Sequence, residues 1–103
     1  MNKGLNRLVD NITEWAKERN LIDGSNPQAQ YVKLIEEAGE LAGNIARGRD
    51  VKDDIGDCVV VLTIIAKQHG LSLSDCVEVA WDDIKDRKGR MVDGVFVKEQ
   101  DLT

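Results

Sequence analysis

Proline and aromatic residues are scarce in this sequence: one Pro, two Trp, one Tyr and one Phe occur among 103 residues. β-Sandwiches and barrels rely on aromatic and β-branched residues, so this shortage disfavours an all-β fold and favours helices. Long apolar runs are also missing, because the longest, residues 58–66, contains Thr63 and is shorter than the ~20 residues of a membrane span. No signal-peptide pattern opens the chain. We therefore expect an all-α, cytoplasmic protein with no membrane partner.

Positive charge and cysteine are scarce as well. Lys and Arg total 14 against 19 Asp and Glu, which gives a formal charge of -5 and a pI near 4.8. Binding to a nucleic-acid polymer needs clustered basic residues, so this balance excludes that class of partner. Cys58 and Cys76 form no CxxC motif and have no matching histidine, which argues against a zinc site or a disulfide framework. We expect two buried, unpaired cysteines.

Hydrophobic periodicity predicts the secondary structure. Apolar residues recur at spacings of three and four, which is typical of amphipathic helices. We expect helices over residues 2–19, 27–47, 51–69 and 73–88, then a short hairpin around Asp93-Gly94 and a loose tail over residues 98–103. Residues 1–103 should form a single domain, an antiparallel four-helix bundle-like fold, because a chain of this length holds one core. Trp15 and Trp81 fall on apolar stripes and are expected in that core rather than stacked on a base.

Two acidic clusters lie on consecutive predicted helices, between Ile35 and Val61. The first contains Glu36, Glu37 and Glu40, and the second contains Asp53, Asp54 and Asp57. At about 100° per residue the three glutamates share one arc of their helix, and carboxylates three or four residues apart can share a ligand. Asp57 pairs equally well with Asp53 or with Asp54, so spacing leaves this choice open. Several hard oxygen donors suit Mg²⁺ or Mn²⁺, the usual ions of phosphoryl chemistry.

A solvated helix face is the alternative explanation of the first cluster. Its glutamates lie roughly opposite an apolar stripe, where solvent is normally found; the stripe is Leu34, Ala38, Leu41 and Ile45. Two features favour a bound cation instead. Glu36 and Glu40 are a repelling pair four residues apart with only Lys33 as a nearby cation. Asp57 shares its helix face with Val61 and Ile64, and a carboxylate on an apolar face needs a partner charge.

The pattern Glu36-Glu37-x-x-Glu40 followed by Asp54-x-x-Asp57 resembles the EExxE and ExxD motifs of MazG-like nucleotide pyrophosphohydrolases. The segment IKDRKGRMVDGVFVKE, residues 84–99, is also similar to small phage-type and bacterial members. This resemblance covers most of the chain. It implies a compact helical enzyme, homodimeric or homotetrameric, that uses Mg²⁺ to hydrolyse (deoxy)nucleoside triphosphates to monophosphate and pyrophosphate, with a role in nucleotide-pool house-cleaning.

Carried over position by position, the resemblance makes Glu37, Glu40, Asp54 and Asp57 the metal ligands. It makes Glu36 a further acid, so that Glu36, Glu37 and Glu40 are the expected catalytic residues. One departure is evident, because the family's second motif usually begins with Glu and this chain has Asp54, which is one methylene shorter. This departure leaves open a non-catalytic relative that binds nucleotide and Mg²⁺. A further alternative is a helical interaction module whose acidic faces are solvated or bind a basic partner.

Three basic residues are candidates for binding the substrate's phosphates. Lys33 precedes the first acidic cluster by one helical turn, and Lys85 and Arg87 belong to a basic cluster at the end of the fourth predicted helix. Cations near a helix C-terminus are also favoured by the helix dipole, which explains Lys85 and Arg87 without a ligand.

Overall fold

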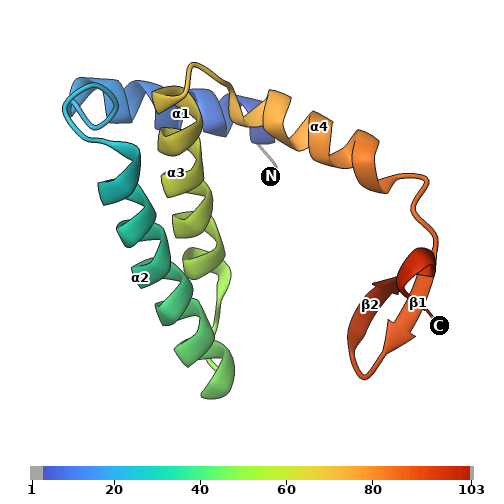
Figure 1. The fold of residues 1–103 in the computed structure, drawn as a ribbon. Coiled ribbons are helices and arrows are strands. Elements are labelled where there is room, and N and C mark those ends of the chain that lie inside the picture. Colours follow the sequence, from blue (N-terminus) through green and yellow to red (C-terminus); the bar gives the residue numbers. More distant parts are fainter. Residues whose placement is uncertain (1–3, 103) are drawn as a thin grey trace.

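The computed structural model describes residues 4–102, in which four α-helices are followed by a two-stranded hairpin and a 3₁₀ turn (Figure 1). The helices are α1 (Leu5–Glu18), α2 (Pro27–Ala46), α3 (Lys52–Gln68) and α4 (Leu73–Ile84). The hairpin strands are β1 (Gly89–Val92) and β2 (Val95–Lys98), and the turn η1 is Glu99–Asp101. The predicted helical class with a short C-terminal hairpin is confirmed.

The helices form a body and an arm. α2 and α3 lie side by side as an antiparallel pair, and α1 crosses this pair at the end where α3 finishes and packs against α3 (Figure 1). α4 leads away from the pair, and the hairpin lies at its far end. We call α1, α2 and α3 the body, and residues 73–101, which comprise α4, the hairpin and η1, the arm.

Local chemistry sets the ends of the helices that hold the acidic clusters. Asn26 is the N-cap of α2: its side-chain oxygen accepts a hydrogen bond from the Ala29 N–H at 2.8 Å, and Pro27 follows at the first helical position. Gly48, with φ of 66°, adopts the left-handed conformation that commonly ends a helix. Asp50 lies before the start of α3, and its Oδ1 accepts from the Lys52 N–H at 3.0 Å. The turn between α2 and α3 is therefore short and well defined.

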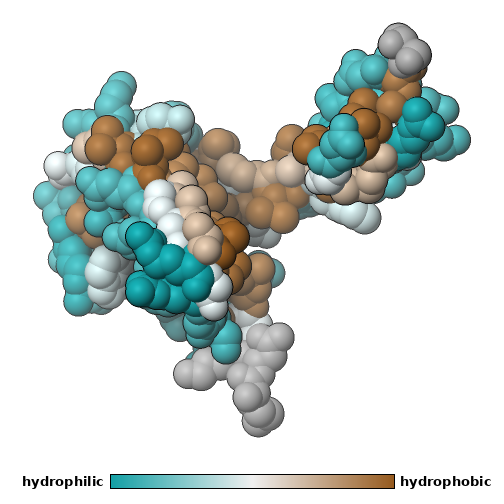
Figure 2. Space-filling model, turned by 90° about the horizontal axis from the view of Figure 1, so that it is seen from below, coloured by the Kyte–Doolittle hydropathy of each residue, from teal (hydrophilic) through white to brown (hydrophobic). Residues whose placement is uncertain are grey.

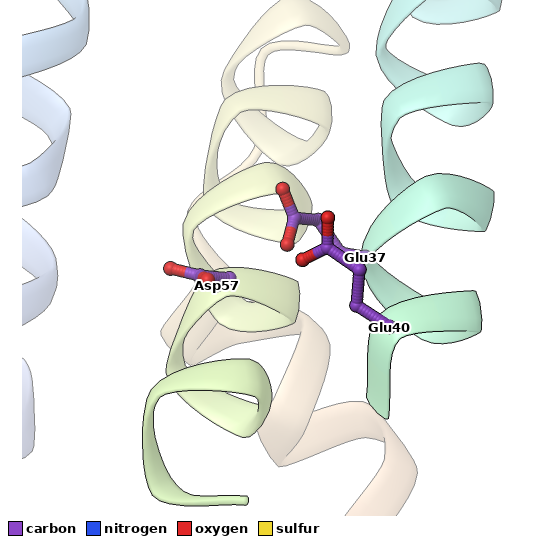
Figure 3. Close-up of side chains that lie close together, drawn as sticks. All are labelled: Glu37, Glu40 and Asp57. Carbon is purple, nitrogen blue, oxygen red and sulfur yellow. The ribbon is translucent and has the colours of Figure 1, made fainter. Parts of the chain in front are cut away.

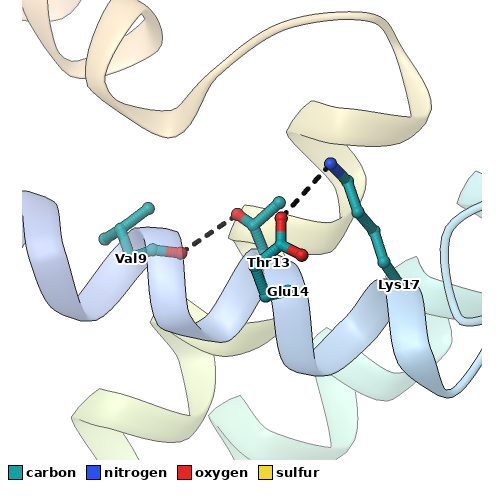
Figure 4. A network of polar contacts seen from close by, with 4 residues as sticks. All are labelled: Val9, Thr13, Glu14 and Lys17. Carbon is teal, nitrogen blue, oxygen red and sulfur yellow. Dashed lines mark hydrogen bonds and ion pairs between the residues drawn. The ribbon is translucent and has the colours of Figure 1, made fainter.

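Side chains make polar contacts on both the buried and the exposed side of α1 (Figure 4). Thr13 is 7% exposed, and its hydroxyl donates to the Val9 carbonyl oxygen at 3.0 Å, which satisfies the hydroxyl within the helix. Lys17 Nζ lies 3.4 Å from Glu14 Oε1 on the exposed side, where an ion pair contributes little to stability.

The buried apolar core of the described residues is small and centred on α3. It consists of Ala16 from α1 and Val61, Ile64 and Ala66 from α3. The expectation that both tryptophans are core residues is wrong, because Trp15 is 43% exposed and Trp81 is 58% exposed. Periodicity places a residue on an apolar stripe, but it does not say whether the same chain covers that stripe.

The arm departs from the expected boundaries. α4 ends at Ile84 rather than at Lys88, because Gly89 already pairs with Lys98 in the hairpin and the residues between must turn. Asp93 and Gly94 connect the strands with φ of 51° and 82°, the paired positive values of a tight hairpin turn.

Residues 98–101 are also not the loose tail that was expected. Lys98 is the last residue of β2, and the Glu99 N–H donates to the Lys88 carbonyl oxygen at 2.8 Å. The 3₁₀ turn η1 follows directly. Thr103 lies outside the described residues.

Two further expectations concern α3 and α4. Cys58 and Cys76 are unpaired, as predicted, but they are half-buried rather than fully buried.

In residues 4–102 no single helix has both the length and the apolar content needed to cross a bilayer. α3 and α4 pass such a test only as a pair bent by 100°, on length and composition alone.

The described chain is extended for its size. Its radius of gyration is 16.3 Å, whereas a compact domain of this length has about 13 Å. Its accessible surface is 7979 Å², against about 5,800 Å² for a compact monomer of this mass. The excess of about 2,200 Å² includes many apolar side chains, which Figure 2 shows on both body and arm.

Candidate metal centre

Three carboxylates converge between α2 and α3. Glu37 and Glu40 extend from α2 toward α3, and Asp57 lies on α3 (Figure 3). One ligand oxygen from each residue lies within 4.8 Å of the other two. Glu37 is 9% exposed, Asp57 is half-buried and Glu40 is exposed, so the cluster opens from the helix interface to solvent. We call Glu37, Glu40 and Asp57 the acidic cluster.

The electrostatics of the acidic cluster fit a cation. Burial raises the pKa of Asp57 above its ordinary value, and the negative charges of Asp53, Glu37 and Asp54 raise that pKa further. Among the described residues, Oε2 of Glu37 is buried and accepts no hydrogen bond. A buried carboxylate oxygen without a partner is costly, and a divalent ion would satisfy it. The donor set is all oxygen, as Mg²⁺ and Mn²⁺ prefer.

Lys33 is the cation beside the acidic cluster. Its Nζ lies 3.4 Å from Glu36 Oε2 and 3.5 Å from Glu37 Oε1. The hydrogen bond and charge of Glu36, followed by those of Glu37, raise the pKa of Lys33. Lys33 leaves Oε2 of Glu37 without a partner, so it does not complete the coordination of this carboxylate.

Asp54 lies at the same helix interface, but Asn44 holds it. Asp54 is 7% exposed, and its Oδ2 accepts a hydrogen bond from the Asn44 side-chain amide at 2.7 Å. It is not one of the three mutually close carboxylates. Asn44 follows Glu37 by seven residues, so the two share a face of α2; this spacing was the sequence signal for Asn44.

Substitution of Asn44 should show how much its hydrogen bond to Asp54 contributes to stability. We expect Asn44→Ala to lower the free energy of unfolding by about 1.5–3 kcal/mol, since a buried carboxylate would lose a hydrogen bond. Urea denaturation measures this. The control Asn6→Ala changes an exposed asparagine of α1 and should stay within about 0.5 kcal/mol of wild type. Strict additivity of Asn44→Ala with Asp54→Ala would contradict the coupling.

The remaining predicted site residues lie apart from the acidic cluster. Glu36 is exposed and its contact is with Lys33. Lys85 and Arg87 follow the end of α4, where they pair with Asp82 at 3.3 Å and Asp83 at 2.7 Å. Arg87 lines a hollow of the arm with Lys88 and Lys98, and the acidic cluster does not border that hollow; the full lining is Asp83, Asp86, Arg87, Lys88, Lys98, Glu99 and Gln100.

One glutamate of α2 is buried, and part of the apolar stripe is exposed. The sequence left two explanations of the glutamates, a bound cation or a solvated face opposite a buried apolar stripe. In fact Glu37 is buried against α3, while Tyr31, Ile35 and Ile45 are each more than half exposed. The contact with α3 therefore covers Glu37 from the acidic side and leaves part of the apolar stripe exposed, a division that periodicity alone does not give.

Comparison with known proteins points to one family. A family model for the MazG nucleotide pyrophosphohydrolase domain matches residues 25–92. A relative from Haemophilus phage HP1, described as an uncharacterized 18.2 kDa protein in the rep-hol intergenic region, is 49% identical over 67 residues. This match covers 63% of the chain and 41% of the relative, so the chain spans about two-fifths of that protein's length. No solved structure gives a significant match.

The chain belongs to the MazG nucleotide pyrophosphohydrolase family, because the family model matches well over half of it and includes both acidic clusters of the sequence. The resemblance noted from the motifs is thereby confirmed. The acidic cluster between α2 and α3 provides oxygen donors suited to a divalent metal.

Proposed function

We propose that this protein hydrolyses (deoxy)nucleoside triphosphates between the α and β phosphates, giving nucleoside monophosphate and pyrophosphate, with Mg²⁺ as the cofactor and Mn²⁺ as a substitute. The observation that supports this most directly is the acidic cluster, in which a buried carboxylate oxygen of Glu37 has no partner. Family membership supplies the class of reaction.

In the proposed mechanism Glu37, Glu40 and Asp57 would hold the ion, and Asp54 would be a further ligand if its carboxylate were released from Asn44. A bound divalent ion polarises phosphoryl oxygens and lowers the pKa of a coordinated water. The oxygen of a water molecule would form a bond to the α phosphorus as the bond from that phosphorus to the α–β bridging oxygen breaks, so that pyrophosphate leaves and nucleoside monophosphate remains. Glu36, or a ligand oxygen not engaged with the ion, accepts the proton of the water. Lys33 lies close enough to the cluster to contact a phosphate.

An assay with purified protein tests the proposal. Mg²⁺ and a panel of canonical and modified triphosphates are supplied, and monophosphate and pyrophosphate are measured. Equal amounts of the two products support the proposed bond cleavage, whereas release of inorganic phosphate contradicts it. Metal-dependent nucleotide binding without turnover would identify the non-catalytic relative, and neither binding nor turnover would leave the interaction module.

We also propose that the active form is a homo-oligomer. The surface excess of about 2,200 Å² exceeds the roughly 800 Å² that each partner contributes to a standard interface. Exposed apolar stripes run along α2 and α4, and a second copy of the chain is the occupant that would bury both. The exposed members include Tyr31, Ile35 and Ile45 on α2 and Val77, Trp81 and Ile84 on α4.

Assembly also bears on the two basic residues of the arm. Lys85 and Arg87 follow α4, whose far end lies away from the α2–α3 pair (Figure 1). A phosphate-binding role for them therefore requires the arm of one copy to reach the acidic cluster of another. Cross-linking or light scattering that gives only monomer at micromolar concentration, with activity intact, would contradict the homo-oligomer as the active form. It would also contradict phosphate binding by Lys85 and Arg87.

Charge repulsion in the acidic cluster leads to a prediction about Asp57. Because the pKa of Asp57 is raised, the folded state binds its proton more tightly than the unfolded state, and ionised Asp57 lowers stability at neutral pH. We expect Asp57→Asn to raise the Tm of the metal-free protein at neutral pH, and the difference from wild type to shrink as the pH falls toward 3.8, the ordinary aspartate value.

Addition of Mg²⁺ should reverse this order. Mg²⁺ at about 100 times its Kd should stabilise the wild type by about 2.7 kcal/mol and the Asp57→Asn variant by much less. Thermal denaturation with Mg²⁺ and with EDTA measures both effects. An equal Tm gain in the two proteins would contradict the role of Asp57 as a ligand.

A further inference from the structure

Asn44 and Asp54 connect α2 to α3 near the short turn between the two helices. Asn44 lies in the last turn of α2, and Asp54 lies in the first turn of α3. The Asn44 Nδ2 donates to Asp54 Oδ2 at 2.7 Å, and Asp54 is buried while Asn44 is half-buried. We call this hydrogen-bonded pair the clasp. Because both side chains are largely removed from water, separating them without a new partner for Asp54 is costly.

The charge of Asp54 is accommodated differently from that of the acidic cluster. Glu37 has a buried carboxylate oxygen that accepts no hydrogen bond from the described residues. Asp54 already accepts a hydrogen bond from a neutral amide, and it lies in the first turn of α3, where the helix dipole stabilises a negative charge. Glu37 therefore lacks a partner that a metal ion would supply, whereas Asp54 has its partner within the chain.

Asp54 is also separated from the acidic cluster in space. Glu37, Glu40 and Asp57 each place one ligand oxygen within 4.8 Å of the other two, and Asp54 does not belong to this group (Figure 3). Its side chain is one methylene shorter than the glutamate that usually begins the second motif. A short carboxylate that is held by its Oδ2 has little freedom to turn toward the cluster.

The clasp lies where it can fix the placement of the two helices that contain the acidic cluster. Asn44 follows Glu40 by four residues, and Asp54 precedes Asp57 by three, so the clasp is about one helical turn from the cluster on both helices. Sliding or rotation of α2 against α3 would move Glu40 away from Asp57. A hydrogen bond between the helices at this point opposes such movement and holds the carboxylates ready for an ion.

We propose that the clasp positions a metal centre of three carboxylates, Glu37, Glu40 and Asp57, and that Asp54 stays bound to Asn44 instead of becoming a fourth ligand. Asn44 and Asp54 are then positioning residues. The inference rests on the proposed function, because it concerns the metal centre of that reaction. It departs from the ligand set that the motif resemblance implies, in which Asp54 is a ligand.

Titration with Mn²⁺, followed by electron paramagnetic resonance, distinguishes a ligand from a positioning residue. Asp54→Asn removes the charge but keeps an oxygen that can accept the hydrogen bond from Asn44. We expect it to raise the Kd for Mn²⁺ about tenfold or less, the effect of one lost neighbouring charge. Asp57→Asn should raise the Kd by more than the roughly 100-fold upper limit for an outer-shell partner. Asp53→Asn is the matched control, because Asp53 is exposed and its charge also acts on Asp57; it should match Asp54→Asn.

Substitution of Asn44 tests the positioning role. Asn44→Ala removes the donor and should weaken Mn²⁺ binding about 10-fold to 100-fold, as loss of an outer-shell partner does. Combining Asn44→Asp with Asp54→Asn exchanges the donor and the acceptor of the clasp and keeps the net charge. This exchange should restore the Kd to within about tenfold of wild type. Circular dichroism checks that each variant is helical, and if Asn44→Ala does not fold, the exchange and Asp54→Asn still decide.

The outcomes separate this inference from the proposed function. A loss of Mn²⁺ binding in Asp54→Asn as large as that in Asp57→Asn would overturn the inference and make Asp54 a fourth ligand. Unchanged or tighter binding in Asn44→Ala would overturn it as well, because the clasp would then not position the centre. If Mn²⁺ binding follows the expected pattern but triphosphates are not hydrolysed, the proposed function fails and the inference stands. If the wild type binds no Mn²⁺, both fail.

Discussion

Glu37→Gln should abolish the Mg²⁺-dependent hydrolysis of nucleoside triphosphates, lowering kcat/KM by at least about 100-fold. Glu37 is the most buried member of the acidic cluster, and its Oε2 is the oxygen left without a partner. The amide of glutamine keeps the size of the side chain but removes the negative charge that a divalent ion needs. The protein should therefore fold while losing both metal binding and turnover. Titration with Mn²⁺, followed by electron paramagnetic resonance, reports metal binding independently of activity.

Glu14→Gln is the matched control for this substitution. It makes the same chemical change on the exposed side of α1, where Glu14 pairs only with Lys17 and the pair is worth little. Glu40→Gln should behave like Glu37→Gln, because Glu40 supplies another oxygen of the same cluster. If Glu37→Gln and Glu40→Gln both turn over substrate at the wild-type rate, the acidic cluster has no role in the reaction.

Ile35→Lys should convert the oligomer to monomers, raising the dissociation constant by about 100-fold or more. Ile35 is 54% exposed in the single chain, so a lysine there costs the monomer little. In the proposed assembly the same position is covered by a second copy, and an unpaired ammonium group would be buried. Analytical ultracentrifugation over a range of concentrations measures the change.

Two comparisons make this second result specific. Glu14→Gln raises the net charge by the same single unit at a position outside the apolar stripes, and it should leave the oligomer intact. Circular dichroism should give a helical spectrum for the Ile35→Lys monomer. A dissociation constant equal to that of the wild type would show that the α2 stripe is not the interface.

Much of the local structure could be predicted from the sequence, because capping and periodicity act within a few residues. Asn26 and Pro27 mark the start of α2, Gly48 its end, and Asp93-Gly94 the hairpin turn. The end of α4 could not be predicted, since it depends on Gly89 pairing with Lys98. Periodicity also could not predict that the tryptophans are exposed, because their exposure depends on which apolar stripes remain uncovered in the tertiary structure.

The candidate site was predictable to a similar degree. Spacing and the motif resemblance identified Glu37, Glu40 and Asp57, which the structure brings together between α2 and α3. The hydrogen bond from Asn44 to Asp54 depends on how two helices pack, and no local pattern encodes that packing. The metal ligation of these residues stays a prediction, as does the role of Glu36.

The small core described above ties folding to protein concentration. Ala16, Val61, Ile64 and Ala66 remove little apolar surface from water, so the described chain gains little free energy from folding alone. If the α2 and α4 stripes are buried only on association, folding and assembly become one bimolecular transition. The melting temperature should then rise with protein concentration, and a sufficiently diluted sample should unfold.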